Sequence, residues 1–286
     1  MRVKYILGAE KPSLSFEVFP PKTQDNFGTV SRAALQIAQL KPDFMSVTYG
    51  AGGSTSKYTV EIAKSILDTG VTPLAHLTCV CSSKESIKEK LIQMKDNGIE
   101  NILALRGDIP QGTTPSQWDF KYANELVTFI KENGDFCVGG ACYPEKHLES
   151  ASEREDTDNL KRKVDAGCDF LTTQMFFDND LFYKYIIRLR RAGINVPVIP
   201  GIMPMCNAKQ IVRSCQLSGA MLPDKFKRIA EHFSDNPVAM QQAGIAYATD
   251  QIIDLIANGF KAIHVYSMNK PEVAQKIQEN LSEIFK

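Results

Sequence analysis

A carboxylic acid lies inside one of the most apolar stretches of the chain. The residues around Glu17 predict a buried strand over 13–19, which Pro20 and Pro21 end. A carboxylate in a buried strand is unfavourable unless it is paired or neutral. Two interpretations follow. Glu17 bonds to a neighbouring arginine or lysine, or apolar surroundings raise its pKa so that it can transfer a proton at the strand end.

Polar side chains also stand at the ends of most other predicted strands. For a single histidine or threonine, a hydrogen-bonded position in the core is the ordinary explanation. So many donors and acceptors together need partners, and a bound polar ligand would supply them. The set comprises Thr48, Tyr49, Gly50, His76, Thr78, Leu105, Arg106, Gly107, Asp108, Ala141, Cys142, Tyr143, Pro144, Thr172, Thr173, Gln174, His264 and Tyr266.

Short β-branched runs alternate with amphipathic segments along the chain. Eight βα units predict an α/β protein with a single (β/α)8 TIM barrel over residues 1–286, whose site lies at the C-terminal ends of its strands. A helical insertion over 207–258 separates the seventh strand from the eighth. The predicted strands are 13–19, 43–49, 73–80, 101–107, 137–143, 169–176, 196–202 and 261–267. The other predicted helices are 27–40, 56–69, 83–97, 119–133, 154–166, 179–192 and 270–285.

The composition argues against several classes of function. The 286 residues carry 33 basic and 33 acidic side chains, so electrostatics gives no reason to expect binding to nucleic acid or to an anionic membrane. The first apolar run is too short to predict a signal peptide, and no segment has the length of a transmembrane helix. Seven cysteines show no paired CxxC spacing, and Cys79 and Cys81 alternate along one predicted strand. We therefore expect reduced thiols in a cytoplasmic protein.

Two glycine-containing segments at strand ends have more than one interpretation. Residues 50–55 follow a strand and precede a helix, but Thr55 replaces the third glycine of a dinucleotide-binding motif. The segment is therefore either a loop over the site or a nest of backbone amides for an anion. Arg106 and Asp108 flank Gly107, which fits either an internal salt bridge or a clamp on a ligand.

One predicted helix carries a polar face beside the expected site. Asp156, Asn159, Arg162 and Lys163 follow one another at spacings of three, three and one residues, so they share this face. The face is either solvated or suited to a pyrophosphate. The small residues 139–141 leave room for a flat ring against the fifth strand. The sequence has no HExxH or GxSxG motif and no cluster of metal ligands, so we expect no metal.

Specific motifs spread over nearly the whole chain resemble those of one known family. They are SFEVFPPK (15–22), SVTYG (46–50), HLTC (76–79), LALRGD (103–108) and NLKRKVDAG (159–167), with Gln174, PGI (200–202) and HVYSMN (264–269). In order and spacing they resemble methylenetetrahydrofolate reductase. The resemblance is to the catalytic barrel alone, without the regulatory domain of the eukaryotic members.

The resemblance implies an FAD enzyme of one-carbon metabolism and methionine biosynthesis, which reduces 5,10-methylenetetrahydrofolate to 5-methyltetrahydrofolate. It implies a ping-pong mechanism in which NADH or NADPH reduces the flavin and leaves, after which folate takes the same face. Glu17 matches the general acid, which protonates N10 and so opens the ring to an N5-iminium cation. Asp108 matches a flavin-facing carboxylate that stabilises this cation and tunes the flavin.

The same matching implies the binding residues and the partners. Folate would meet Gln174, Gln210, Tyr266 and Lys270. A homo-oligomer is implied, and some relatives work with a partner subunit that delivers electrons. The implied flavin contacts are Thr48, His76, Leu105, Arg106, Gly107, Asp108, Tyr122, Ala123, Tyr143, His147, Asp156, Asn159, Arg162 and Lys163.

Two departures from the family pattern leave the electron donor open. Ser214 stands where well-known bacterial members carry a phenylalanine that stacks on the ligand, and Lys270 stands where they carry an arginine. Two rival functions also remain. One is a lyase or aldolase with Lys22 or Lys163 as a Schiff-base amine. The other is a non-catalytic electron-transfer or scaffold subunit, against which the two retained acids argue.

Overall fold

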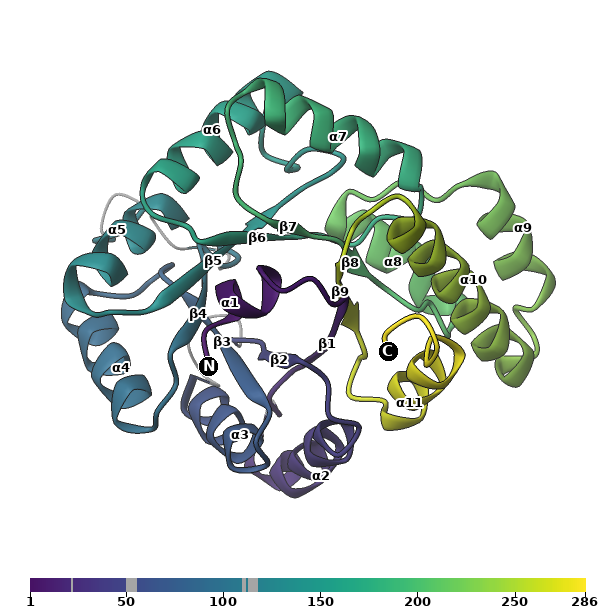
Figure 1. Ribbon diagram of the computed structural model, residues 1–286, viewed down its shortest axis with the longest axis horizontal. Coiled ribbons are helices and arrows are strands. Elements are labelled where there is room, and N and C mark those ends of the chain that lie inside the picture. The colour runs from purple at the N-terminus through teal and green to yellow at the C-terminus, as the bar shows by residue number, and fades with distance from the viewer. Residues whose placement is uncertain (22, 50–55, 110–111, 113–117) are drawn as a thin grey trace.

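The computed structural model describes residues 1–21, 23–49, 56–109, 112 and 118–286. Within them, parallel strands form one sheet in the order β7-β6-β5-β4-β3-β2-β1-β9-β8, bent into a barrel with helices outside it (Figure 1). This confirms the predicted α/β TIM barrel. The strands are β1 Ser13–Val18, β2 Phe44–Val47, β3 Thr72–Thr78, β4 Asn101–Leu105, β5 Cys137–Cys142, β6 Phe170–Thr173, β7 Val198–Ile199, β8 Gly201–Ile202 and β9 Ala262–Tyr266.

Pro200 divides the predicted seventh strand into β7 and β8. β7 pairs with β6, and β8 pairs with β9, so the two ends of the sheet order meet at this single residue. Proline has no amide proton to give to a neighbouring strand. Its carbonyl still accepts a hydrogen bond of 3.0 Å from the amide of His264. The chain itself therefore closes the ring where the ladder is interrupted.

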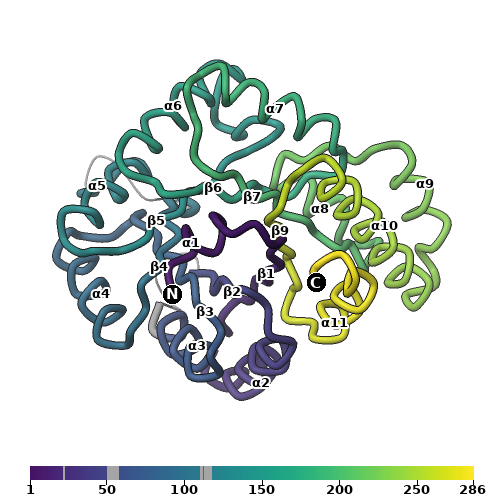
Figure 2. The backbone as a smooth tube through the Cα atoms, in the orientation of Figure 1, coloured from purple at the N-terminus to yellow at the C-terminus, as the bar shows by residue number. Residues whose placement is uncertain are grey.

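The helices follow the predicted order around the barrel, and the insertion between the last two predicted strands contains α8, α9 and α10 (Figures 1 and 2). Two elements, α1 and the short 3-10 helix η1, were not predicted. The bounds are α1 Val3–Leu7, η1 Gln24–Asn26, α2 Phe27–Ala38, α3 Ser56–Asp68, α4 Lys84–Asp96, α5 Ala123–Asn133, α6 Glu153–Asp165, α7 Asn179–Arg191, α8 Ala208–Ser218, α9 Asp224–His232, α10 Pro237–Ala257 and α11 Pro271–Asn280.

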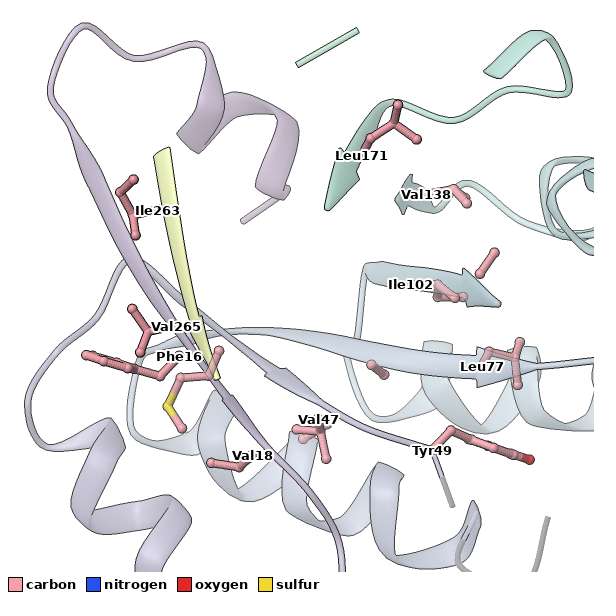
Figure 3. Packing of buried hydrophobic residues seen from close by; sticks show 14 of the residues in the cluster. Phe16, Val18, Val47, Tyr49, Leu77, Ile102, Val138, Leu171, Ile263 and Val265 are labelled. Carbon is pink, nitrogen blue, oxygen red and sulfur yellow. The ribbon is translucent and has the colours of Figure 1, made fainter. Parts of the chain in front are cut away.

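The largest apolar cluster lies between the barrel and its helices. Side chains alternate along each strand, so Phe16 and Val18 of β1 point outward, as do Val47, Leu77 and Val265 of other strands (Figure 3). These residues pack against the inner faces of the helices. The inward positions are therefore free to carry polar groups at one end of the barrel and apolar groups at the other.

The helix α1 covers the N-terminal end of the barrel, where both Figure 1 and Figure 2 place it inside the ring of strands. Its Val3 packs with Phe44, Leu103 and Phe170 from the barrel interior. The buried Asn101 of β4 fixes the start of this helix. Its Oδ1 accepts from the Val3 amide at 2.8 Å, and its Nδ2 donates to the carbonyls of Met1 and Pro73 at 3.0 and 3.1 Å.

One prediction about the cysteines is wrong. The strand β3 ends at Thr78, so Cys79 and Cys81 do not alternate along it. Cys79 is buried, whereas Cys81 is exposed with a positive φ of 57°. All seven cysteines are free thiols in the structure. In the part of the chain that the structure describes, no helix is long and apolar enough to cross a membrane.

The role of Asn101 can be tested by Asn101→Ala. This change leaves the Val3 amide and two carbonyls without their partner in a buried place, so we expect the free energy of unfolding to fall by about 2–4 kcal/mol. Urea unfolding followed by circular dichroism measures it. Asn133→Ala is the matched control, because Asn133 donates an exposed bond to Phe129 at the end of α5. Equal effects of the two changes would contradict the proposed anchoring of α1.

Candidate active site

A cavity of about 750 Å³ opens where the strands end at their carboxyl side. All of the residues that the family resemblance assigned to the site, except Gln210 and Lys270, line it. The strands and the segments directly after them supply Glu17, Thr48, His76, Leu105, Arg106, Gly107, Asp108, Tyr143, His147, Gln174 and Tyr266. The helices α5 and α6, with the residue before α5, supply Tyr122, Ala123, Asp156, Asn159, Arg162 and Lys163.

Glu17 is held at the inner end of this cavity by side chains of three other strands. Its Oε2 accepts a hydrogen bond of 3.0 Å from Ser46 of β2. The Nε2 atoms of His76 and His264 lie 3.4 and 3.6 Å from the same oxygen. The hydroxyl of Ser267 donates to the Glu17 carbonyl at 2.6 Å and fixes the backbone. The Glu17 side chain is 17% exposed, so it meets the cavity with little access to solvent.

The surroundings of Glu17 differ from the prediction made from the sequence. Burial raises the pKa of Glu17, but its contacts with His264, His76 and Ser46 lower the pKa by more. The net pKa lies below the ordinary value of a glutamate. The expectation that apolar surroundings leave this acid neutral is therefore wrong. The apolar neighbours in the sequence point outward, whereas Glu17 points inward among polar side chains of other strands.

His76 presents a polar atom that its own surroundings do not satisfy. Its Nε2 is buried and has no hydrogen-bond partner among the described residues. Burial lowers the pKa of His76 to about 4, although the charge of Glu17 raises it. The ring is therefore neutral at neutral pH. A buried neutral imidazole with an open nitrogen is available to a bound ligand.

Arg106 forms an ion pair inside the chain. Its guanidinium binds Glu149 with two bonds of 2.5 and 2.6 Å, and its Nε donates to the carbonyl of Gly107. Of the two interpretations of Arg106, Gly107 and Asp108, the structure has an internal salt bridge, but with Glu149 rather than Asp108. Gly107 adopts a φ of +88°, and a Cβ there would lie 2.9 Å from Val80, so this turn requires glycine.

The polar face predicted on one helix exists on α6 and faces the cavity. Lys163 is partly buried and donates to the Ala141 carbonyl at 2.7 Å, and burial lowers its pKa. Asp156 is buried and accepts from the His147 amide and from Ser150, so it orders the segment after β5. Arg162 donates to Asn159 on the same face. The face is thus partly buried rather than fully solvated.

The small residues of β5 serve the packing of the chain. A Cβ at Gly139 would lie 2.5 Å from the ring of Phe170, and one at Gly140 would lie 2.9 Å from the Lys163 side chain. Neither glycine is among the described residues that line the cavity, whereas Ala141 is. The interpretation that both glycines make room for a flat ligand ring is therefore wrong. They make room for neighbouring side chains.

The predicted folate residues divide into two groups. Gln174 and Tyr266 line the cavity, and Tyr266 donates to the Thr173 carbonyl at 2.5 Å. Gln210 is exposed on α8, and Lys270 precedes α11, and neither is among the described lining residues. The departure Ser214 is also on α8 and outside the lining. The segment 50–55 and Lys22 lie outside the described residues.

Two residues of the site were missed in the sequence. Glu149, the partner of Arg106, lies in a segment without regular structure, so no periodicity marked it. Ser46 is one residue of an apolar strand, yet it bonds to Glu17 and faces His264. The register between β1 and β2, which pairs Glu17 with Ser46, would have identified it, but register cannot be predicted from one sequence.

These features define a (β/α)8 barrel enzyme with a polar cavity, lined by both acidic and basic side chains, at the carboxyl ends of its strands. The profile of the family described as Methylenetetrahydrofolate reductase matches residues 2–282, and the chain belongs to this family of oxidoreductases. It is 36% identical over 271 residues to the 5,10-methylenetetrahydrofolate reductase of Pectobacterium carotovorum subsp. carotovorum, which covers 94% of this chain and 90% of that protein. The resemblance seen in the sequence is confirmed.

Two further relatives give the same result. The 5,10-methylenetetrahydrofolate reductase of Escherichia coli is 36% identical over 270 residues, with 94% of this chain and 90% of that protein covered. The Arabidopsis thaliana protein named Methylenetetrahydrofolate reductase (NADH) 1 is 35% identical over 298 residues. That match covers 99% of this chain but 50% of the plant protein.

Solved structures with low sequence identity share the fold. A Clostridium thermocellum protein described as binding two copies of 5-methyl-5,6,7,8-tetrahydrofolic acid superposes with a TM-score of 0.67 at 13% identity, covering 99% of this chain and all of that one. A 2,3-dimethylmalate lyase gives a TM-score of 0.54 at 10% identity, covering 99% and 84%. At these identities the likeness establishes the barrel alone.

The buried His76 should make stability depend on pH. Its pKa of about 4 in the folded protein lies below the ordinary 6.5, so the unfolded chain binds a proton between these values that the folded chain excludes. The free energy of unfolding should fall as the pH drops from 6.5 to 4, by on the order of 3 kcal/mol from this residue. Urea unfolding at several pH values should show a smaller loss in His76→Gln. His232→Gln, on α9, is the control, and equal losses in both variants would contradict the assignment.

Proposed function

We propose that this protein reduces 5,10-methylenetetrahydrofolate to 5-methyltetrahydrofolate with FAD as its bound cofactor and NADH or NADPH as the electron donor. The observation that carries the proposal is the carboxyl group of Glu17, only 17% exposed, which lines the same cavity as the cations Arg106, Arg162 and Lys163. Family membership supports the reaction, since the relatives are named for it. The absorption experiment described below distinguishes NADH, NADPH and a partner subunit as the source of electrons.

The cavity is large enough for a flavin dinucleotide, and its lining includes cations for the phosphates. A volume of about 750 Å³ is in the range of cofactor sites. Arg106, Arg162 and Lys163 are all among its lining residues, and such cations suit a pyrophosphate. The open Nε2 of His76 offers a polar partner deeper in the cavity. When bound, FAD supplies the hydride that the reduction requires.

The chain's own residues would bind the folate and move one proton. Glu17 would give a proton to N10 of the folate, which opens the five-membered ring and leaves a cationic N5-methylene group. Asp108 lines the same cavity, and its carboxylate would stabilise this cation. Gln174 and Tyr266 would orient the folate beside Glu17. The likeness to a barrel protein described as binding a folate is consistent with this role.

The rival use of Lys163 as a Schiff-base amine meets a structural obstacle. A nucleophilic amine must be directed at the carbonyl carbon of its substrate. Lys163 instead directs its Nζ to the Ala141 carbonyl at 2.7 Å, on the wall of the barrel. This geometry favours a role in holding the chain and a ligand anion.

The first test is the visible absorption spectrum of the purified protein after incubation with FAD and desalting. We expect flavin bands that bleach when NADH or NADPH is added without oxygen and that return when methylenetetrahydrofolate follows. A protein that retains no flavin would refute the proposal. Bands that persist with both nucleotides, but bleach with dithionite and return with folate, would support the folate reaction and assign the electrons to another donor.

The role of Glu17 is tested by Glu17→Gln. Only the folate half-reaction needs its proton, so flavin reduction by NADH should stay near the wild-type rate while folate reduction slows at least about 100-fold. Anaerobic stopped-flow absorbance measures both half-reactions. Glu100→Gln is the matched control, because Glu100 pairs with the N-terminal amine at the other end of the barrel. Equal slowing of both half-reactions in Glu17→Gln would remove Glu17 from the role of acid.

A further inference from the structure

A continuous line of polar side chains runs from Glu17 into the barrel interior, away from the cavity. Ser46 Oγ lies 3.0 Å from Glu17 Oε2 and 3.1 Å from His264 Nε2. On the other side of the ring, His264 Nδ1 lies 2.8 Å from Ser15 Oγ. The His264 side chain is 2% exposed and does not belong to the lining of the cavity among the described residues. Catalysis by Glu17 as described above does not use it.

The hydrogen bonds fix which ring nitrogen of His264 always carries a proton. Ser15 Oγ also lies 3.0 Å from the carbonyl oxygen of Ile263, and a carbonyl can only accept. The single hydroxyl proton of Ser15 therefore goes to Ile263. The contact between Ser15 and His264 then needs a proton on Nδ1, which donates to the Ser15 oxygen. Nε2 is left as the nitrogen that gains or loses a proton.

The position of Ser46 couples this nitrogen to Glu17. A hydroxyl has one proton, so Ser46 can donate to only one of its two neighbours and must accept from the other. When Ser46 donates to an ionised Glu17, Nε2 of His264 carries a proton and the ring is an imidazolium. When Ser46 donates to Nε2, Glu17 carries the proton. In both arrangements the two groups hold one proton between them.

We infer that Glu17 and His264 share one transferable proton through the hydroxyl of Ser46, which makes His264 the positioning residue that keeps an acid proton available beside the cavity. The inference rests on the proposed function of Glu17. In the transfer, the Nε2–H bond of His264 breaks as a new O–H bond forms on Ser46. The original O–H bond of Ser46 breaks as Oε2 of Glu17 gains the proton. Each turnover then takes up one proton from solvent.

Two other titratable side chains, His76 and Tyr266, face Glu17 and His264, but neither supplies the shared proton. His76 of β3 contacts Glu17, but burial lowers its pKa to about 4, so it does not supply the proton at neutral pH. Tyr266 of β9 packs edge-on against His264, and burial raises its pKa well above the ordinary value. From β2, Phe44 stacks on the His264 ring and holds its orientation. Of the contacts that lower the pKa of Glu17, the one with His264 is the largest.

Nitrogen-15 magnetic resonance of histidine-labelled protein tests the shared proton without any turnover. In the wild type we expect Nδ1 of His264 to carry a proton throughout, and Nε2 to share its proton with Glu17 through Ser46. In Glu17→Gln, which has no carboxylate to balance the charge, only Nδ1 should remain protonated. Spectra of His264→Gln assign the signals. A wild-type ring that carries its single proton on Nε2, with Nδ1 bare, would overturn the inference.

The pH profile of the folate half-reaction provides the kinetic test. The pair retains its proton to a higher pH than Glu17 alone would, so the alkaline fall in rate should move to lower pH by about one unit in His264→Gln. Flavin reduction should keep its wild-type profile. A merely structural role would scale the rate equally at every pH, and that outcome would overturn the inference.

Two further variants test the proton transfer even if His264→Gln does not fold. Ser46→Ala keeps both titrating groups and removes only the hydroxyl between them, so it should slow folate reduction about tenfold while leaving flavin reduction unchanged. An unchanged folate rate would count against the relay. Ser13→Ala is the control, since Ser13 is buried two residues before Ser15 and takes no part in these contacts. A wild type that never reduces folate would refute the proposed function, whereas the magnetic resonance result would still decide the shared proton.

Discussion

The placement of one carboxyl group inside the barrel shapes the residues around it. Desolvation opposes the charged form of Glu17, and the surrounding strands offset this with Ser46, His76 and His264. Each of these side chains comes from a different strand, so the arrangement exists only when the barrel is closed. The acid is therefore a product of the tertiary fold, even though it lies in a short and recognisable sequence motif.

The cations of the cavity are held in a similar way by the chain itself. Arg106 is paired with Glu149, and Lys163 is bonded to the Ala141 carbonyl. A buried or half-buried cation without any partner would be strongly destabilising, so the protein keeps partners for both. An anionic ligand at Arg106 must therefore compete with the Glu149 carboxylate. The ion pair of Arg106 with Glu149 thus stabilises the unliganded protein and also neutralises one positive charge of the cavity.

The sequence predicted the order of strands and helices because alternation and the spacing of βα units are local signals. It also predicted most of the residues that line the cavity, since residues at the ends of parallel strands converge at one end of a barrel. It did not predict the short α1, whose place depends on Asn101 of β4. It also gave the wrong direction for the pKa of Glu17, because the neighbours that set this pKa are adjacent in space through strand register.

The interruption of the sheet at Pro200 leaves β9 with one long and one short strand pairing. β9, which carries His264 and Tyr266, is paired with β1 over five residue positions from Ser13 to Glu17, but with β8 over only two. Its alignment is thus set by the strand that bears the acid. The chain that leads from β8 into α8 is attached to the ring by the shorter ladder. Movement of α8 and the insertion that follows can consequently be absorbed at this seam, while the alignment of Glu17 with His264 is preserved.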